Sequence, residues 1–208
     1  MSDPTRLAVA AIGGLDGVVL SVRPDDVVRS TPCADWRVAE LLDHVVDELR
    51  WAPPLLAGRS LDQAAAEVAA ASPASPERAW GAAAARAVDA IRRTSTHRMV
   101  ATSAGPAPAG HYLTEVFADL LVHRWDLAVA IGVDDQLPTG LVATALDWFA
   151  ASADEWRAAG ALAAAVPVAP DADPQTRLLA ELGRDRRAWL LRRSPDAASP
   201  RPSARPAA

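Results

Sequence analysis

Apolar residues recur along most of the chain at the spacing of an amphipathic helix, and the strict alternation of a half-buried strand is almost absent. Four long stretches carry the helical pattern, at residues 5–22, 36–56, 76–94 and 111–131. Four amphipathic stripes are most simply buried against one another. The pattern therefore predicts an all-α protein built on a four-helix bundle.

Several residues mark where these helices begin, end or are interrupted. Asp35 is a good N-cap for the second long stretch, and Gly132 is expected to stop the fourth. Pro53 and Pro54 are expected to bend or break the last turns of the second helix. Residues 102–110 (TSAGPAPAG) are rich in helix breakers and are predicted to form a loop.

The rest of the chain adds shorter elements to the bundle. Weaker helical patterns lie at residues 60–71, 138–157 and 174–182. After residue 193 the chain consists mostly of Pro, Ala, Ser and Arg, which predicts disorder. We therefore expect three parts: a bundle over residues 1–160, a short C-terminal extension packed on it over 161–193, and a disordered tail over 194–208.

Composition and charge exclude several classes of protein. With 208 residues, of which 50% are apolar, the chain can bury a core without disulfides. A net charge of −5 and the lack of a basic stripe predict no nucleic-acid partner. The apolar runs are interrupted by Arg, Asp or Pro, which predicts no membrane span. The single cysteine, Cys33, and a start without a basic, apolar leader favour a cytoplasmic location.

Two of the predicted helices carry polar residues at the border of their apolar stripes. Asp119 and His123 are four residues apart, so their side chains stack on one side of the helix. His44 lies at the border of the second long stretch. If these two helices pack through their apolar faces, two imidazoles and one carboxylate converge, which is a ligand set for a divalent transition metal with an open position. Asp126 can accept the remaining imidazole N–H of His123.

Spacing alone leaves other interpretations open. An Asp and a His four apart are common as a solvated pair, and a border histidine such as His44 is more often a hydrogen-bonded packing residue. Glu48 competes as a carboxylate ligand, although a solvated face shared with Asp47 and Arg50 is the simpler interpretation. Two histidines and a carboxylate also form the mononuclear non-haem iron triad, but that chemistry usually occurs on a β-barrel.

Other side chains near these helices have a simple structural interpretation. Cys33 precedes the second helix, where a thiol can have a lowered pKa, but a small buried side chain in a turn is the favoured interpretation. Trp36 and Trp148 are expected in the core or in a pocket wall. His97 and His111 flank the breaker-rich segment and are expected at the surface or in a loop.

Three blocks of this sequence resemble the actinobacterial maleylpyruvate isomerase-like family, which belongs to the DinB-like superfamily of metal-binding helical bundles. The first block is TPCADW at residues 31–36, followed by Val38, Leu41, Leu42 and His44. The second runs from Asp119 through His123 and WDLA at 125–128 to Ile131 and Gly132. The third is LLAELGRD at 178–185. The resemblance extends over nearly the whole chain up to the tail.

The resemblance implies a DinB-like four-helix bundle with extra C-terminal helices, in which His44, Asp119 and His123 bind a divalent metal, zinc being the expected ion. The isomerases of this family carry Glu at the position of Asp119. The best-understood relatives use mycothiol, and a metal with an open position favours a bound thiol in its thiolate form. The resemblance thus implies an isomerase or S-transferase whose partners are a small thiol and an electrophilic substrate.

Two other functional hypotheses stay open at this point. The first is a metal-binding module without catalysis, acting as a sensor or scaffold. The second is a bundle whose polar cluster binds no metal and whose role is oligomerisation. The sequence is compatible with either a monomer or a homodimer.

Overall fold

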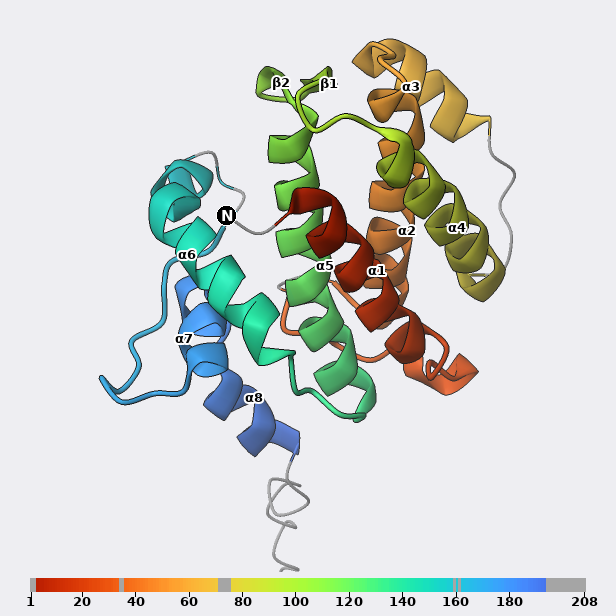
Figure 1. Cartoon of the computed structure of the whole chain (residues 1–208). Helices are drawn as coiled ribbons and strands as arrows, with labels where there is room; N and C mark the ends of the chain where they lie inside the picture. The colour runs from red at the N-terminus through yellow and green to blue at the C-terminus, as the bar shows by residue number, and fades with distance from the viewer. Residues whose placement is uncertain (1–2, 34–35, 71–75, 159, 161, 194–208) are drawn as a thin grey trace, which may run out of the picture.

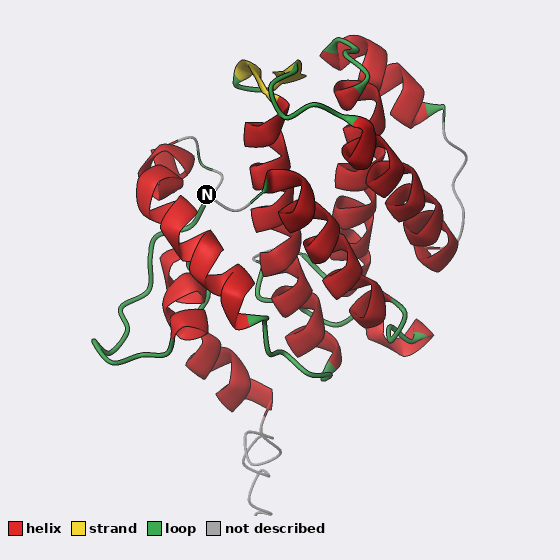
Figure 2. Cartoon of the chain, viewed as in Figure 1, coloured by secondary structure: helices red, strands yellow, loops and turns green. Residues whose placement is uncertain are grey.

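The structure is a computed structural model that describes residues 3–33, 36–70, 76–158, 160 and 162–193. Most of the described chain is helical (Figures 1 and 2). The helices are α1 (Pro4–Val19), α2 (Val38–Leu56), α3 (Leu61–Ala69), α4 (Pro76–Arg93), α5 (Ala109–Ile131), α6 (Thr139–Ala158), α7 (Pro174–Glu181) and α8 (Arg186–Arg193), with a short 3-10 helix, η1 (Pro24–Asp26). The predicted N-cap Asp35 and the predicted tail at 194–208 lie outside the described residues.

Four of these helices, α1, α2, α4 and α5, form the predicted bundle. Helix α1 packs against α5 and α4, and α2 packs against α4 and α5. Figure 1 shows α1 and α5 running in one direction and α2 and α4 in the other. Large buried side chains fill the centre, among them Leu15, Leu41, Trp80, Phe117 and Leu120. The prediction of an all-α four-helix bundle is therefore confirmed.

Side-chain hydrogen bonds tie α1 to both of its neighbours. The indole Nε1 of Trp80 on α4 donates to Oδ1 of Asp16 at 2.8 Å. The guanidinium Nε of Arg124 on α5 donates to the carbonyl oxygen of Gly14 at 3.1 Å. Helix α5, which carries Asp119 and His123, is thereby fixed against the first helix as well as against the core.

The second long helix begins later than predicted, and the prediction that Trp36 starts it is wrong. Helix α2 begins at Val38, and the backbone N–H of Arg37 just before it donates to a carboxylate oxygen of Glu40 at 2.9 Å. The segment in front of the helix is folded back, because the backbone N–H of Thr31 donates to the carbonyl oxygen of Trp36 at 3.1 Å. Trp36 thus lies on a loop outside the helix.

The prediction of a loop over residues 102–110 is also wrong in part, because most of this segment belongs to a β-hairpin. Strand β1 (Met99–Thr102) pairs antiparallel with β2 (Gly105–Pro108). Gly105 has a φ of +112°, which suits a turn, and the hydroxyl of Thr102 donates to its carbonyl oxygen at 2.6 Å. Strands this short and rich in Pro and Gly show no clear alternation of polarity, which is why the pattern missed them.

One further helix end agrees with the sequence, whereas α1 ends at Val19 and not at residue 22 as predicted. Helix α5 ends at Gly132, which has a φ of +83°, as predicted. Helix α2, by contrast, continues through Pro53 and Pro54 to Leu56, so the proline pair does not break it. Helices α6 to α8 lie beside the bundle, with α6 packed on α7 (Figure 1). No helix in the described part of the chain is long and apolar enough to cross a membrane.

Candidate metal centre

The three side chains predicted as metal ligands meet between α2 and α5. Nε2 of His44 lies 3.3 Å from Oδ2 of Asp119, and Nε2 of His123 lies 3.2 Å from Oδ1 of the same carboxylate. One donor atom from each residue lies within 4.8 Å of the other two. The two imidazole nitrogens therefore face a single carboxylate from two helices.

Helix geometry and burial explain how this group is presented. Asp119 and His123 are one turn apart on α5, and the antiparallel α2 brings His44 across from them. The side chain of His123 is 7% exposed, whereas those of His44 and Asp119 are 27% and 32% exposed. The cluster is consequently anchored in the core on one side and open on the other.

The open side of the cluster faces a cavity of about 550 Å³. The indole of Trp36 lies against His44, with ring centroids 4.8 Å apart, and forms part of the wall. Trp148 and Trp156 of α6 also line the cavity, as do Thr102 and Ser103 of the hairpin. The structure thus places Trp36 and Trp148 in a pocket wall, one of the two locations expected for them.

A further ion pair holds His123 in place from behind. Its Nδ1 lies 3.0 Å from Oδ2 of Asp126, the residue expected to accept this N–H, and Asp126 is fully buried. Arg184 donates to both oxygens of Asp126, from Nη2 at 2.9 Å and from Nε at 3.4 Å. With Nδ1–H bound to Asp126, Nε2 of His123 is the nitrogen available to a cation.

Sequence reasoning did not find the role of Arg184. It lies in the third block of the family resemblance, 58 residues after its partner Asp126. No helical or strand periodicity relates two positions that far apart, so only that resemblance marked the segment.

The charges of the cluster reinforce one another. Burial opposes ionisation of Asp126, but Arg184 and His123 outweigh it and hold the pKa of this carboxyl below its usual value. Burial also disfavours the charged form of His123, yet Asp119 and Asp126 raise its pKa to about 9. Burial likewise opposes ionisation of Asp119, and His123 and His44 nevertheless keep its pKa well below the usual range. The site thus attracts positive charge, either as a proton or as a cation.

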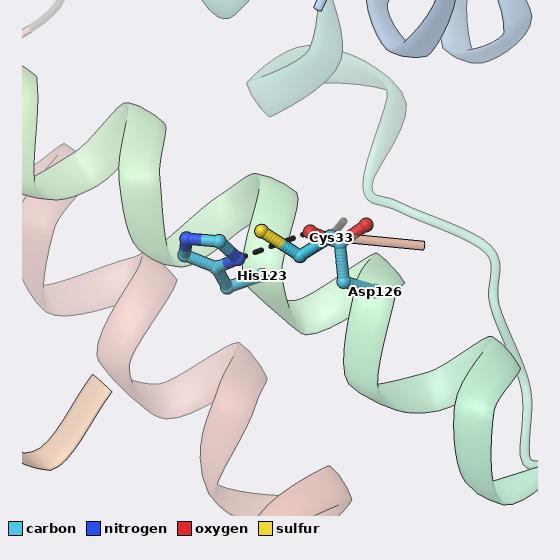
Figure 3. A group of neighbouring side chains, drawn as sticks. All are labelled: Cys33, His123 and Asp126. Atoms are coloured by element: carbon cyan, nitrogen blue, oxygen red, sulfur yellow. Dashed lines mark hydrogen bonds and ion pairs between the residues drawn. The ribbon is translucent and has the colours of Figure 1, made fainter. Parts of the chain in front are cut away.

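A second group of donors, Cys33, His123 and Asp126, lies on the other side of the same imidazole (Figure 3). It is less suited to a cation, because the Arg184 guanidinium already neutralises Asp126. Burial also raises the pKa of the Cys33 thiol to about 11, with Arg184 opposing this in part. The thiol is therefore protonated at neutral pH, and the lowered pKa considered for Cys33 is wrong.

Glu48 differs from its expected position on a solvated face. It lines the cavity, where burial and the charge of Asp119 raise its pKa to about 7. Only its neighbours behave as expected: Asp47 is exposed and its carboxylate lies 3.1 Å from the guanidinium of Arg50. The position of Glu48 at the border of the apolar stripe of α2 left its orientation open in the sequence. The packing of α2 against α5 places the side chain in the cavity wall.

The histidines expected at the surface are there. His97 is exposed, and His111 is exposed with its Nε2 lying 3.2 Å from the carboxylate of Glu115. Neither belongs to a donor cluster among the residues that the structure describes.

Comparison with known proteins agrees with this architecture. The family profile described as the mycothiol maleylpyruvate isomerase N-terminal domain matches residues 9–128, a range that includes all three candidate ligands. Among solved structures, a mycothiol-dependent maleylpyruvate isomerase and a histidine-to-alanine mutant of that isomerase are similar, each with a TM-score of 0.57. Their sequences are 20% and 19% identical to this one, over 76% of this chain and 71% of theirs. At this identity the likeness shows the fold. No curated protein sequence matches the chain.

The buried ion pair behind His123 leads to a prediction about stability. Replacing Arg184 by Met removes the guanidinium from the buried carboxylate of Asp126 and leaves it only the ring of His123, and we expect the free energy of unfolding to fall by about 3 kcal/mol or more. Urea unfolding followed by circular dichroism, in the presence of a chelator, measures this change. The exposed Arg177→Met is the matched control and should stay within about 0.5 kcal/mol of the wild type. An equally small change in Arg184→Met would contradict the role assigned to the pair.

The raised pKa of Cys33 leads to a prediction about reactivity. In the folded protein the thiolate fraction stays low until the pH approaches 11, so alkylation by iodoacetamide should be slow at pH 7–8 and still accelerate at pH 10. In urea the same thiol should titrate near its ordinary pKa of about 8.5. Mass spectrometry of the time course at several pH values measures both rates. A rate that levels off below pH 9 in the folded protein would disprove the assignment.

Proposed function

This chain belongs to the mycothiol maleylpyruvate isomerase N-terminal domain family, and on that premise we propose that it is a divalent-metal-binding protein that uses a small thiol to isomerise, or to transfer a group to or from, an electrophilic substrate. The observation that carries the proposal is the convergence of His44, Asp119 and His123 on the wall of a cavity large enough for small molecules.

The donor set fits a catalytic cation. Two imidazole nitrogens and one carboxylate, with one side open to a cavity, are typical of catalytic zinc, and zinc is the ion we propose. Asp119 is one methylene shorter than the Glu found in the isomerases of the family. Its carboxylate nevertheless lies 3.2 and 3.3 Å from the two imidazole nitrogens, so the shorter side chain reaches both.

The thiol that we propose is mycothiol, the one named for the two similar isomerase structures. A divalent cation with an open position stabilises a bound thiol as the thiolate, which is the nucleophilic form. The sulfur would attack an electrophilic carbon of the substrate, and the thiol would leave after rearrangement. A substrate of the maleylpyruvate type is the first to test, and the cytoplasm is the proposed location.

The protein's own residues orient and shield these partners. Asp126 and Arg184 fix the ring of His123, so its Nε2 stays directed at Asp119. Trp36 lies against His44 with ring centroids 4.8 Å apart and gives that side of the site an apolar wall. Pocket walls that are mostly apolar and carry a few polar groups bind small ligands in a defined orientation.

Metal analysis of the purified protein tests the cation site. We expect roughly one divalent cation per chain in the wild type and a loss of affinity on the order of 100-fold or more in His44→Ala and in His123→Ala, because each removes a ligand. Competition with a chromophoric chelator gives the affinities, and circular dichroism verifies that the variants are folded. The exposed His97→Ala is the control and should retain the metal. Equal metal affinity in the wild type and all three variants would contradict the proposed metal site.

Turnover separates an enzyme from a metal-binding module. With mycothiol present, the metal-loaded protein should convert maleylpyruvate, and omission of either the thiol or the metal should abolish conversion, since both supply the nucleophile. Substrate absorbance follows the reaction. A protein that binds metal tightly but shows no thiol-dependent turnover with this or related electrophiles would instead support the non-catalytic module.

A further inference from the structure

Glu48 is a carboxyl group in the candidate active site that has no structural task. It lies one helical turn after His44 on α2 and lines the same cavity as the three candidate ligands. Within the described part of the chain no hydrogen bond or ion pair engages its side chain. An acid placed in a cavity wall without a protein partner is free to exchange a proton with whatever enters.

A neighbouring side chain offers an unused hydrogen-bond donor to a ligand in this part of the cavity. Tyr112 of α5 is 7% exposed and lines the cavity, and its hydroxyl has no hydrogen-bond partner among the described residues. Burial, with Glu48 and two further carboxylates of α5, raises the pKa of Tyr112 well above its usual value, so it keeps its proton. A buried O–H donor costs free energy unless an acceptor reaches it, and here that acceptor must come from a ligand or water.

The surroundings of Glu48 suit an acid that exchanges protons near neutral pH. His44 faces it from its own helix, and Asp119, His123 and Glu115 face it from α5. Burial and Asp119 raise its pKa to about 7, while His44 and His123 act in the opposite direction. A general base works best when its pKa lies near the working pH.

We propose that Glu48 is the catalytic base that accepts the proton of the thiol co-substrate, an inference that rests on the proposed thiol-dependent function. The S–H bond breaks, an O–H bond forms on the Glu48 carboxylate, and the electron pair stays on sulfur for attack on the substrate. When the thiol leaves the rearranged product, Glu48 returns the proton to sulfur. The cycle therefore consumes no proton and needs no further reactant.

Calorimetry of mycothiol binding to the metal-loaded protein tests this step without turnover. Titrations at pH 7 in buffers of different ionisation enthalpy give the number of protons released per thiol bound. At this pH about half of the Glu48 carboxyls are ionised before the thiol binds, and the negative thiolate beside them then raises their pKa further. The wild type should therefore release about half a proton fewer per bound thiol than Glu48→Gln. In a parallel assay kcat of Glu48→Gln should fall by about 100-fold with unchanged metal content.

The matched control is Glu67→Gln, which changes an exposed carboxylate on α3 and should behave as the wild type. Equal proton release by the wild type and Glu48→Gln, with both binding mycothiol, would overturn the role of Glu48 and leave the proposed function intact. Failure of the metal-loaded wild type to bind mycothiol would overturn the proposed function and this inference together. Loss of metal from Glu48→Gln would assign Glu48 to the ligand set and overturn its role as a base.

Discussion

The candidate site depends on one buried carboxylate, that of Asp126. It accepts the Nδ1–H of His123 at 3.0 Å on one side and is paired with Arg184 at 2.9 Å on the other. A carboxylate buried without a counter-charge would be protonated, and the imidazole would then lose the partner that fixes its tautomer and orientation. The candidate cation site on α2 and α5 is therefore supported by a residue that lies beyond α7, outside the four-helix bundle.

This arrangement also determines where positive charge belongs in the molecule. On the Asp126 side of the imidazole, the guanidinium of Arg184 supplies it permanently. On the Asp119 side no arginine or other fixed cation pairs with the carboxylate among the described residues, and two imidazole nitrogens point at it instead. The same ring thus separates a closed, neutralised environment from an open, negatively charged one. That asymmetry is the physical reason to place an exchangeable cation beside Asp119.

How much of the fold and of the candidate site could be predicted from the sequence depends on how far apart the interacting residues lie along the chain. The four long helices followed from apolar periodicity, and the Asp119 and His123 pair followed from its spacing of four on one helix. The meeting of His44 with that pair required two helices to pack in one register, which the spacing allowed but did not decide. Arg184 and the hairpin had no periodic signal at all. For Glu48 the sequence left two positions open and favoured the solvated face, because only the packing of the helices shows that this side chain lines the cavity.

About half of the residues that line the cavity lie outside α2 and α5, the helices that carry the three candidate ligands. Thr102 and Ser103 belong to the hairpin between α4 and α5, and Trp148 and Trp156 belong to α6. Evolution can lengthen such a hairpin or exchange those indoles without disturbing α2 or α5. The shape of the cavity can in this way change between related chains while the two helices that carry His44, Asp119 and His123 stay the same.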